Sequence, residues 1–129
     1  ASPAFVQRYF SDGVGAGSLA RAPSLVFNTK DELQTRWAHR LCHRHVELPR
    51  HTLPSSQAFV TAALAGMGWG LHPQALIAAH LEEGSLVTLL PDAPLDVPLY
   101  WQQARAASAL LDGLNRQILS AARAALIQA

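Results

Sequence analysis

The stretch that decides the fold of this chain is LPSSQAFVTAALAGMGWGLHP, residues 53–73. Its order predicts a strand end, a helix that begins at a pair of serines, a glycine stop and a second short strand. Ser55 and Ser56 fall at the expected helix start, where backbone N–H groups have no partners within the helix. Because hydroxyls and free N–H groups meet there, this stretch predicts a site for a small anion.

The composition indicates one ordered domain with a small net charge. The chain has 129 residues, of which 50% are hydrophobic and 15% are charged, which favours a real core and excludes disorder. The formal net charge of +1 gives no basic footprint for nucleic acid and no polybasic face for a membrane. The single cysteine, Cys42, excludes an internal disulfide and fits a reducing compartment. We therefore expect a protein that works without a membrane and without resident cofactor.

The sequence shows no membrane-spanning segment and no secretory signal. No apolar run reaches membrane-spanning length, and the N-terminal residues lack the charged start and apolar core of a secretory signal. We expect a cytoplasmic location. Because the sequence has no initiator segment, we also expect it to be a piece of a longer protein.

Short apolar runs alternate with helical patterns along the chain. The expected elements are strands at residues 24–28, 69–71, 85–90 and 97–103, an extended segment at 47–53, and helices at about 2–10, 32–41, 56–65, 74–79 and 108–127. This order predicts an α/β fold with a mostly parallel sheet flanked by helices. Ligands of such sheets bind beyond the carboxyl ends of the strands, where helix N-termini gather.

Several segments together resemble the effector-binding domain of LysR-type transcriptional regulators. They are ASPAF (1–5), LPSS (53–56), ALAGMGWGLHP (63–73) and GSLVTLL (84–90). Two more, LVFNTKDELQ (25–34) and DVPLYWQ (96–102), resemble the branch that responds to lysine and arginine, the ArgP/LysG type. The resemblance runs the full length of the chain and implies a periplasmic-binding-protein-like regulatory fold.

The resemblance also implies which parts of such a regulator this chain would hold. Residues 1–95 would form the second effector-binding subdomain, and residues 96–129 would return to the first subdomain as a strand and a C-terminal helix. Members of the family bind DNA through an N-terminal helix-turn-helix domain, which would lie outside this chain. The expected partners are a small amino-acid effector, DNA only through that missing domain, and further copies of the protein in a homodimer or higher oligomer.

The paired serines and the second strand supply the first group of candidate effector-binding residues. By the resemblance, Ser55 and Ser56 line the cleft between the subdomains, where they could hold the α-carboxylate of an amino acid. Gly68 and Gly70 let a ligand approach the backbone, and Trp69 offers a wall for an aliphatic or cationic side chain. Helix capping by the serines and core packing by Trp69 are the structural alternatives.

The end of the first strand supplies the second group. Phe27 and Asn28 should lie on the same edge of the sheet, and Asn28 offers both a donor and an acceptor. A basic effector also calls for a carboxylate, for which Asp31 is the best candidate. Turn capping by Asn28 and helix capping by Asp31 are the structural alternatives, and the part of the protein outside this chain could supply the carboxylate instead.

Two other classes of protein compete with this interpretation. A metal-binding protein could use the cluster His39, Cys42, His43, His45 and His51, although its spacing matches no strong zinc motif and four neighbouring arginines repel a cation. A solute-binding half-domain shares the expected architecture, but a secretory signal is lacking. No nucleophile elbow or spaced carboxylate pair indicates an enzyme.

Overall fold

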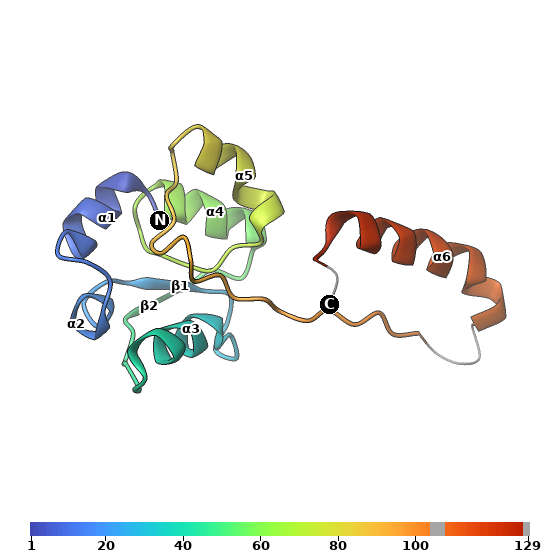
Figure 1. Cartoon of the computed structure of the whole chain (residues 1–129), viewed down its shortest axis with the longest axis horizontal. Coiled ribbons are helices and arrows are strands. Elements are labelled where there is room, and N and C mark those ends of the chain that lie inside the picture. The colour runs from blue at the N-terminus through green and yellow to red at the C-terminus, as the bar shows by residue number, and fades with distance from the viewer. Residues whose placement is uncertain (104–107, 128–129) are drawn as a thin grey trace. The chain divides into compact units, whose positions relative to one another are not determined.

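The computed structural model of the chain describes residues 1–103 and 108–127. It divides into two compact units, Ala1–Leu95 and Asp96–Ala129, which are drawn together in Figure 1 and described separately below. None of the helices in the described residues is long and apolar enough to cross a membrane.

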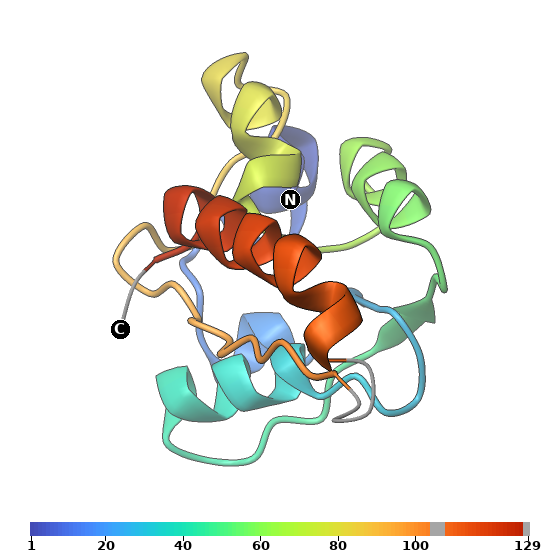
Figure 2. The same cartoon turned by 90° about the vertical axis from the view of Figure 1, so that its right-hand side faces the viewer.

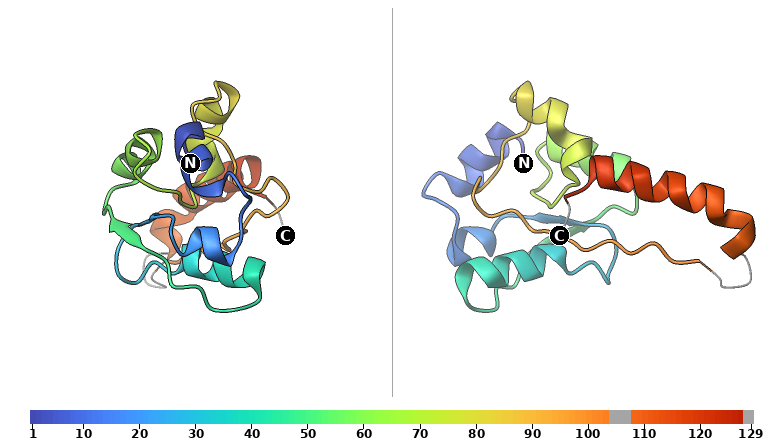
Figure 3. Two further views of the ribbon diagram at one scale, coloured as in Figure 1. Left: turned by 90° about the vertical axis from the view of Figure 1, so that its left-hand side faces the viewer. Right: turned by 45° about the vertical axis from the view of Figure 1, so that its right-hand side comes forward.

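The first unit is built around a parallel pair of short strands. Strand β1, Ser24–Val26, pairs in parallel with β2, Arg50–Thr52, and Ser24 lies opposite Arg50. Helix α3, Leu33–Cys42, lies on one side of the strands, and helix α4, Ser56–Leu64, lies on the other (Figures 2 and 3). The predicted α/β class with parallel strands flanked by helices is confirmed, although the sheet is smaller than expected.

A polar side chain caps the first helix of the unit. Helix α1, Pro3–Phe10, starts after Ser2, whose hydroxyl accepts a hydrogen bond from the backbone N–H of Phe5 at 3.4 Å. Proline at the first helical position suits this start because its missing N–H would be unpaired there anyway. Two further helices complete the unit, α2 at Ala16–Leu19 and α5 at Gln74–Glu82.

The core lies on both sides of the strands. One buried cluster joins α1, α2 and α3 and comprises Phe5, Phe10, Leu19, Ala22, Trp37, Ala38, Val46, Leu48 and Trp69. The other joins β1 to α4 and comprises Leu25, Phe59, Ala62, Ala63 and Leu86. The stretch at residues 53–73 supplies side chains to both clusters, which is why it organises the whole unit.

Three predicted strands do not form. Residues 69–71 make a single parallel bridge, between Trp69 and Ser24. Residues 85–90 pair with the chain start instead, because the backbone N–H of Val87 donates to the carbonyl of Ala1 at 2.8 Å. Residues 97–103 are not in a strand. A strand needs a neighbouring strand, and the described part of the second unit offers only a helix.

Gly68 allows a close approach between the segment before Trp69 and the start of β1. A Cβ at this position would lie 2.7 Å from Leu25 Cδ2 and 2.8 Å from the carbonyl oxygen of Pro23. Contacts this short with a backbone atom cannot be relieved by moving one flexible side chain. Glycine therefore lets the segment before Trp69 lie directly against β1.

We expect Gly68→Ala to lower the free energy of unfolding by about 1–3 kcal/mol, as overpacking of a core does. Urea unfolding of the purified protein measures this loss. Gly17→Ala is the matched control, because the added Cβ would meet only the end of the Arg21 side chain at 3.7 Å. Equal stability of the two variants would contradict the close approach.

The second unit consists of an extended segment and helix α6, Ser108–Ala125. The Trp101 indole N–H donates to the side-chain oxygen of Asn115 at 2.9 Å and ties the segment to the helix. Several large apolar side chains of this unit are exposed, namely Val97, Leu99, Tyr100, Trp101, Leu114, Leu119, Leu126 and Ile127. The described part of the unit thus presents exposed apolar surface.

Candidate effector pocket

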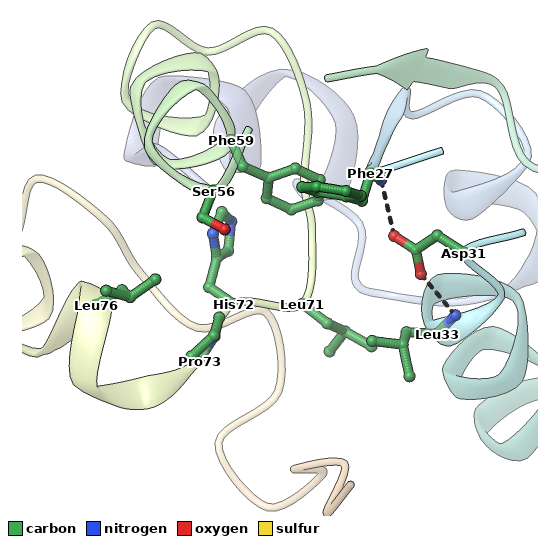
Figure 4. Close-up of a pocket in the computed structure, with 9 residues that line it drawn as sticks. All are labelled: Phe27, Asp31, Leu33, Ser56, Phe59, Leu71, His72, Pro73 and Leu76. Carbon is green, nitrogen blue, oxygen red and sulfur yellow. Dashed lines mark hydrogen bonds between the residues drawn. The ribbon is translucent and has the colours of Figure 1, made fainter. Parts of the chain in front are cut away.

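A pocket opens where the carboxyl end of β1 meets the start of α4. Its volume is about 140 Å³. Figure 4 shows the side chains around it, with Asp31 and Leu33 on one side and Pro73 and Leu76 on the other. Its lining residues are Phe27, Asp31, Leu33, Ser56, Phe59, Leu71, His72, Pro73 and Leu76. The pocket is therefore mainly apolar, with a carboxylate, a hydroxyl and an imidazole as its polar groups.

Asp31 is fixed in the pocket wall by backbone hydrogen bonds. Its Oδ2 accepts from the backbone N–H of Phe27 at 2.9 Å, and its Oδ1 accepts from that of Leu33 at 3.1 Å (Figure 4). A carboxylate has about four acceptor positions, so two stay available. Asp31 thus both closes the turn before α3 and offers a negative charge to the pocket.

The paired serines have different surroundings. Ser55 is the N-cap of α4, and its hydroxyl accepts from the backbone N–H of Ala58 at 3.3 Å. Ser56 is the first residue of the helix and lines the pocket. Within the described residues, nothing accepts a hydrogen bond from the backbone N–H of Ser56 or Gln57. The helix start therefore combines a free hydroxyl with free N–H donors beside the pocket, which suits an anionic group.

Trp69 lies in the core and does not line the pocket. Only 1% of its surface is exposed, and its indole N–H donates to the carbonyl of Ala22 at 3.3 Å. Its ring packs on that of Trp37, with 5.3 Å between the ring centroids. Core packing, the structural alternative that the sequence left open, accounts for these contacts. Gly68 has a packing role beside it, as described above.

Asn28 and Gly70 hold the local structure around the pocket without lining it. The Asn28 side-chain oxygen accepts from the backbone N–H of Lys30 at 2.8 Å, which caps the turn. A Cβ at Gly70 would lie 2.7 Å from Cε1 of Phe59. Gly70 thereby leaves room for the Phe59 ring, which is itself part of the pocket wall.

His72 lines the pocket but was not among the residues predicted from the sequence. The residue follows the bridge at Trp69 by three positions, beyond the carboxyl end of the predicted strand at 69–71, which is where ligands of parallel sheets bind. That rule could have identified it. Burial lowers the pKa of its imidazole to about 4, so the ring is uncharged at neutral pH.

Two histidines of the predicted metal cluster belong to a different surface. His39 and His45 line a shallow basic groove together with Arg36, Arg40 and Glu32, and its volume is about 450 Å³. Within the described residues, no three His, Cys, Asp or Glu side chains are grouped so that they could hold a metal ion. The metal-binding alternative is therefore not favoured.

Comparison with known proteins finds relatives that match along most of this chain. A family model described as LysR substrate binding domain matches residues 9–123. The regulator ArgP of Pseudomonas fluorescens is 46% identical over 121 residues, which cover 92% of this chain. The regulator LysG of Mycobacterium bovis is 41% identical over 122 residues, or 95% of the chain. The chain spans 40% of the length of each of these relatives.

Solved structures agree with these matches. The C-terminal domains of a LysR family protein from Agrobacterium tumefaciens superpose with a TM-score of 0.96 at 50% identity, over 100% of this chain and 62% of that chain. LysG from Corynebacterium glutamicum, solved with bound effector Arg, superposes with a TM-score of 0.79 at 32% identity, over 99% of this chain and 42% of that one.

Proposed function

Because this chain belongs to the LysR substrate binding domain family, we propose that it is the effector-sensing part of a longer bacterial transcriptional regulator, and that the effector is lysine or arginine. The observation that carries the choice of effector is the pocket, where the Asp31 carboxylate faces the same space as the apolar wall and the start of α4. The relatives named ArgP and LysG support it.

The pocket chemistry suits an amino acid with a cationic side chain. The hydroxyl of Ser56 and the free N–H groups at the start of α4 would hold the α-carboxylate, with Ser55 fixing the helix start. The two unused acceptor positions of Asp31 would take the guanidinium or ammonium group through charge-assisted hydrogen bonds. The rings of Phe27 and Phe59 would pack against the aliphatic part between the two ends.

The pocket is smaller than a complete binding site for a small molecule. Its volume of about 140 Å³ is below the ~300 Å³ at which pockets for small molecules begin. We propose that residues 1–95 are the second effector-binding subdomain and that residues 96–129 belong to the first. The rest of the first subdomain, outside this chain, would then supply the opposite wall.

Regulation would follow from closure of this two-walled site. An effector that binds the closed form better shifts the population of the whole protein towards that form. We propose that the complete protein works in the cytoplasm as a homodimer or higher oligomer, and that it binds DNA through an N-terminal domain outside this chain. The named relatives are transcriptional regulators, which supports a regulatory and not a catalytic role.

Isothermal titration calorimetry of the complete protein tests the effector. We expect saturable binding of L-arginine or L-lysine, with one site per chain. Citrulline and norleucine are matched controls, because citrulline keeps the shape of arginine and norleucine keeps the four-carbon chain of lysine, but neither side chain is charged. We expect them to bind at least about tenfold more weakly, a difference of ~1.4 kcal/mol. No heat with either basic amino acid would refute this class of effector.

A further inference from the structure

A buried ring nitrogen of His72, in the wall of the effector pocket, has no hydrogen-bond partner within the described residues. The Nε2 atom of His72 is buried and makes no hydrogen bond within the described residues. Most buried polar atoms in folded proteins are paired, and an unpaired one costs on the order of 1–3 kcal/mol. The chain therefore carries a destabilising imidazole at the edge of the pocket.

The position of this imidazole is fixed by its neighbours. The Phe59 ring meets it edge-on, with 4.9 Å between the ring centroids and an angle of 70° between the planes. A Cβ at Gly70 would lie 3.4 Å from Nε2 and would also collide with Phe59. Figure 4 draws His72 together with Ser56 and Phe59 among the residues that line the pocket. Packing thus holds the ring in the pocket wall, between the aromatic surface and the helix start.

We infer that His72 is an effector-binding residue, whose imidazole forms a hydrogen bond with the effector through a ring nitrogen that the protein leaves unpaired. This inference rests on the proposed function, because it assigns a further contact within the same pocket. An uncharged imidazole has one nitrogen that donates and one that accepts. The accepting nitrogen would take an N–H of the effector's α-ammonium group, which is next to the α-carboxylate at the start of α4, and the apolar neighbours of the ring would strengthen that bond.

The protonation state of His72 agrees with a cationic ligand. Burial lowers the pKa of this imidazole from 6.5 to about 4. A ring that stays uncharged at neutral pH does not repel the α-ammonium group of an amino acid, whereas a protonated one would repel it and could not accept a hydrogen bond. With His72 uncharged, the charge of the pocket lining comes from the Asp31 carboxylate.

Calorimetry on variants of the complete regulator, with L-arginine and L-lysine as probes, tests this inference. We expect His72→Leu to weaken the binding of the basic amino acid by about tenfold or more, as loss of a hydrogen bond to a charged group does. We expect His72→Gln, which keeps an acceptor, to stay within about threefold of the wild type. His51→Leu, at an exposed histidine of β2, is the matched control and should bind as the wild type does.

The melting temperature of the ligand-free variants separates binding from structure. We expect the melting temperature of His72→Leu to equal or exceed that of the wild type, because an apolar side chain replaces an unpaired buried nitrogen. If the wild type binds and His72→Leu binds equally well, the inference is wrong while the proposed function stands. If both His72 variants lose affinity equally and both melt at lower temperatures, His72 has a structural role, and the inference is also wrong. If the wild type binds neither amino acid, the proposed function itself fails.

Discussion

Replacement of Trp69 by alanine is expected to lower the free energy of unfolding of this domain by about 3–5 kcal/mol. The side chain is 1% exposed, its ring packs on Trp37, and its indole N–H donates to the carbonyl of Ala22. Alanine would leave a large cavity and an unpaired carbonyl at the same place. Because folded domains are stable by only about 5–15 kcal/mol in total, this one change removes a large share of the stability.

Urea unfolding of the complete protein, followed through the transition of this domain, measures the loss. Trp69→Phe should cost less, because it keeps an aromatic ring and loses only the indole N–H and part of the volume. Met67→Ala is the matched control, since Met67 lies two residues away in the same segment and is 46% exposed. We expect it to change the stability by less than about 1 kcal/mol. A similar small change for Trp69→Ala would contradict the packing role.

Replacement of Asp31 by asparagine is expected to weaken the binding of arginine or lysine by about 30- to 150-fold, or ~2–3 kcal/mol. The substitution removes the negative charge that would pair with the effector. It keeps one oxygen that can accept from the backbone N–H of Leu33, but it removes the acceptor for that of Phe27. Part of any effect could therefore come from the turn, so a thermal melt of the same variant should accompany the titration.

Glu32→Gln is the matched control for this experiment. It removes the same charge from the next residue, whose side chain lines the basic groove of α3 and not the effector pocket. We expect it to leave the affinity within about threefold of the wild type. If Asp31→Asn also binds with unchanged affinity, then Asp31 only caps the turn, and the carboxylate for the effector lies elsewhere.

Local rules of sequence predicted the helices of this fold. Ser2 and Ser55 cap α1 and α4 because a hydroxyl can reach the N–H three residues on, a contact decided within one turn of chain. The strands were predicted less well, because a strand exists only where a neighbour pairs with it. Residues 85–90 have a strand-like composition, yet they pair with the chain start, a contact 86 positions away that no local pattern encodes.

Part of the pocket could also be predicted from the sequence. Phe27, Asp31 and Ser56 were candidates because they follow strand ends and open helices, and the fold places all three around one space. Their role in binding stays a prediction. Trp69 faces the core instead, and the sequence could not decide this because an alternating pattern does not say which face of a short segment is buried.

A crystal structure of the complete regulator with bound L-arginine tests the central claim most directly. The account predicts arginine in the pocket of Figure 4, with its guanidinium within hydrogen-bonding distance of the Asp31 carboxylate, about 2.7–3.2 Å, and its α-carboxylate at the start of α4. Arginine bound elsewhere in the protein, with Asp31 and Ser56 facing solvent, would contradict it.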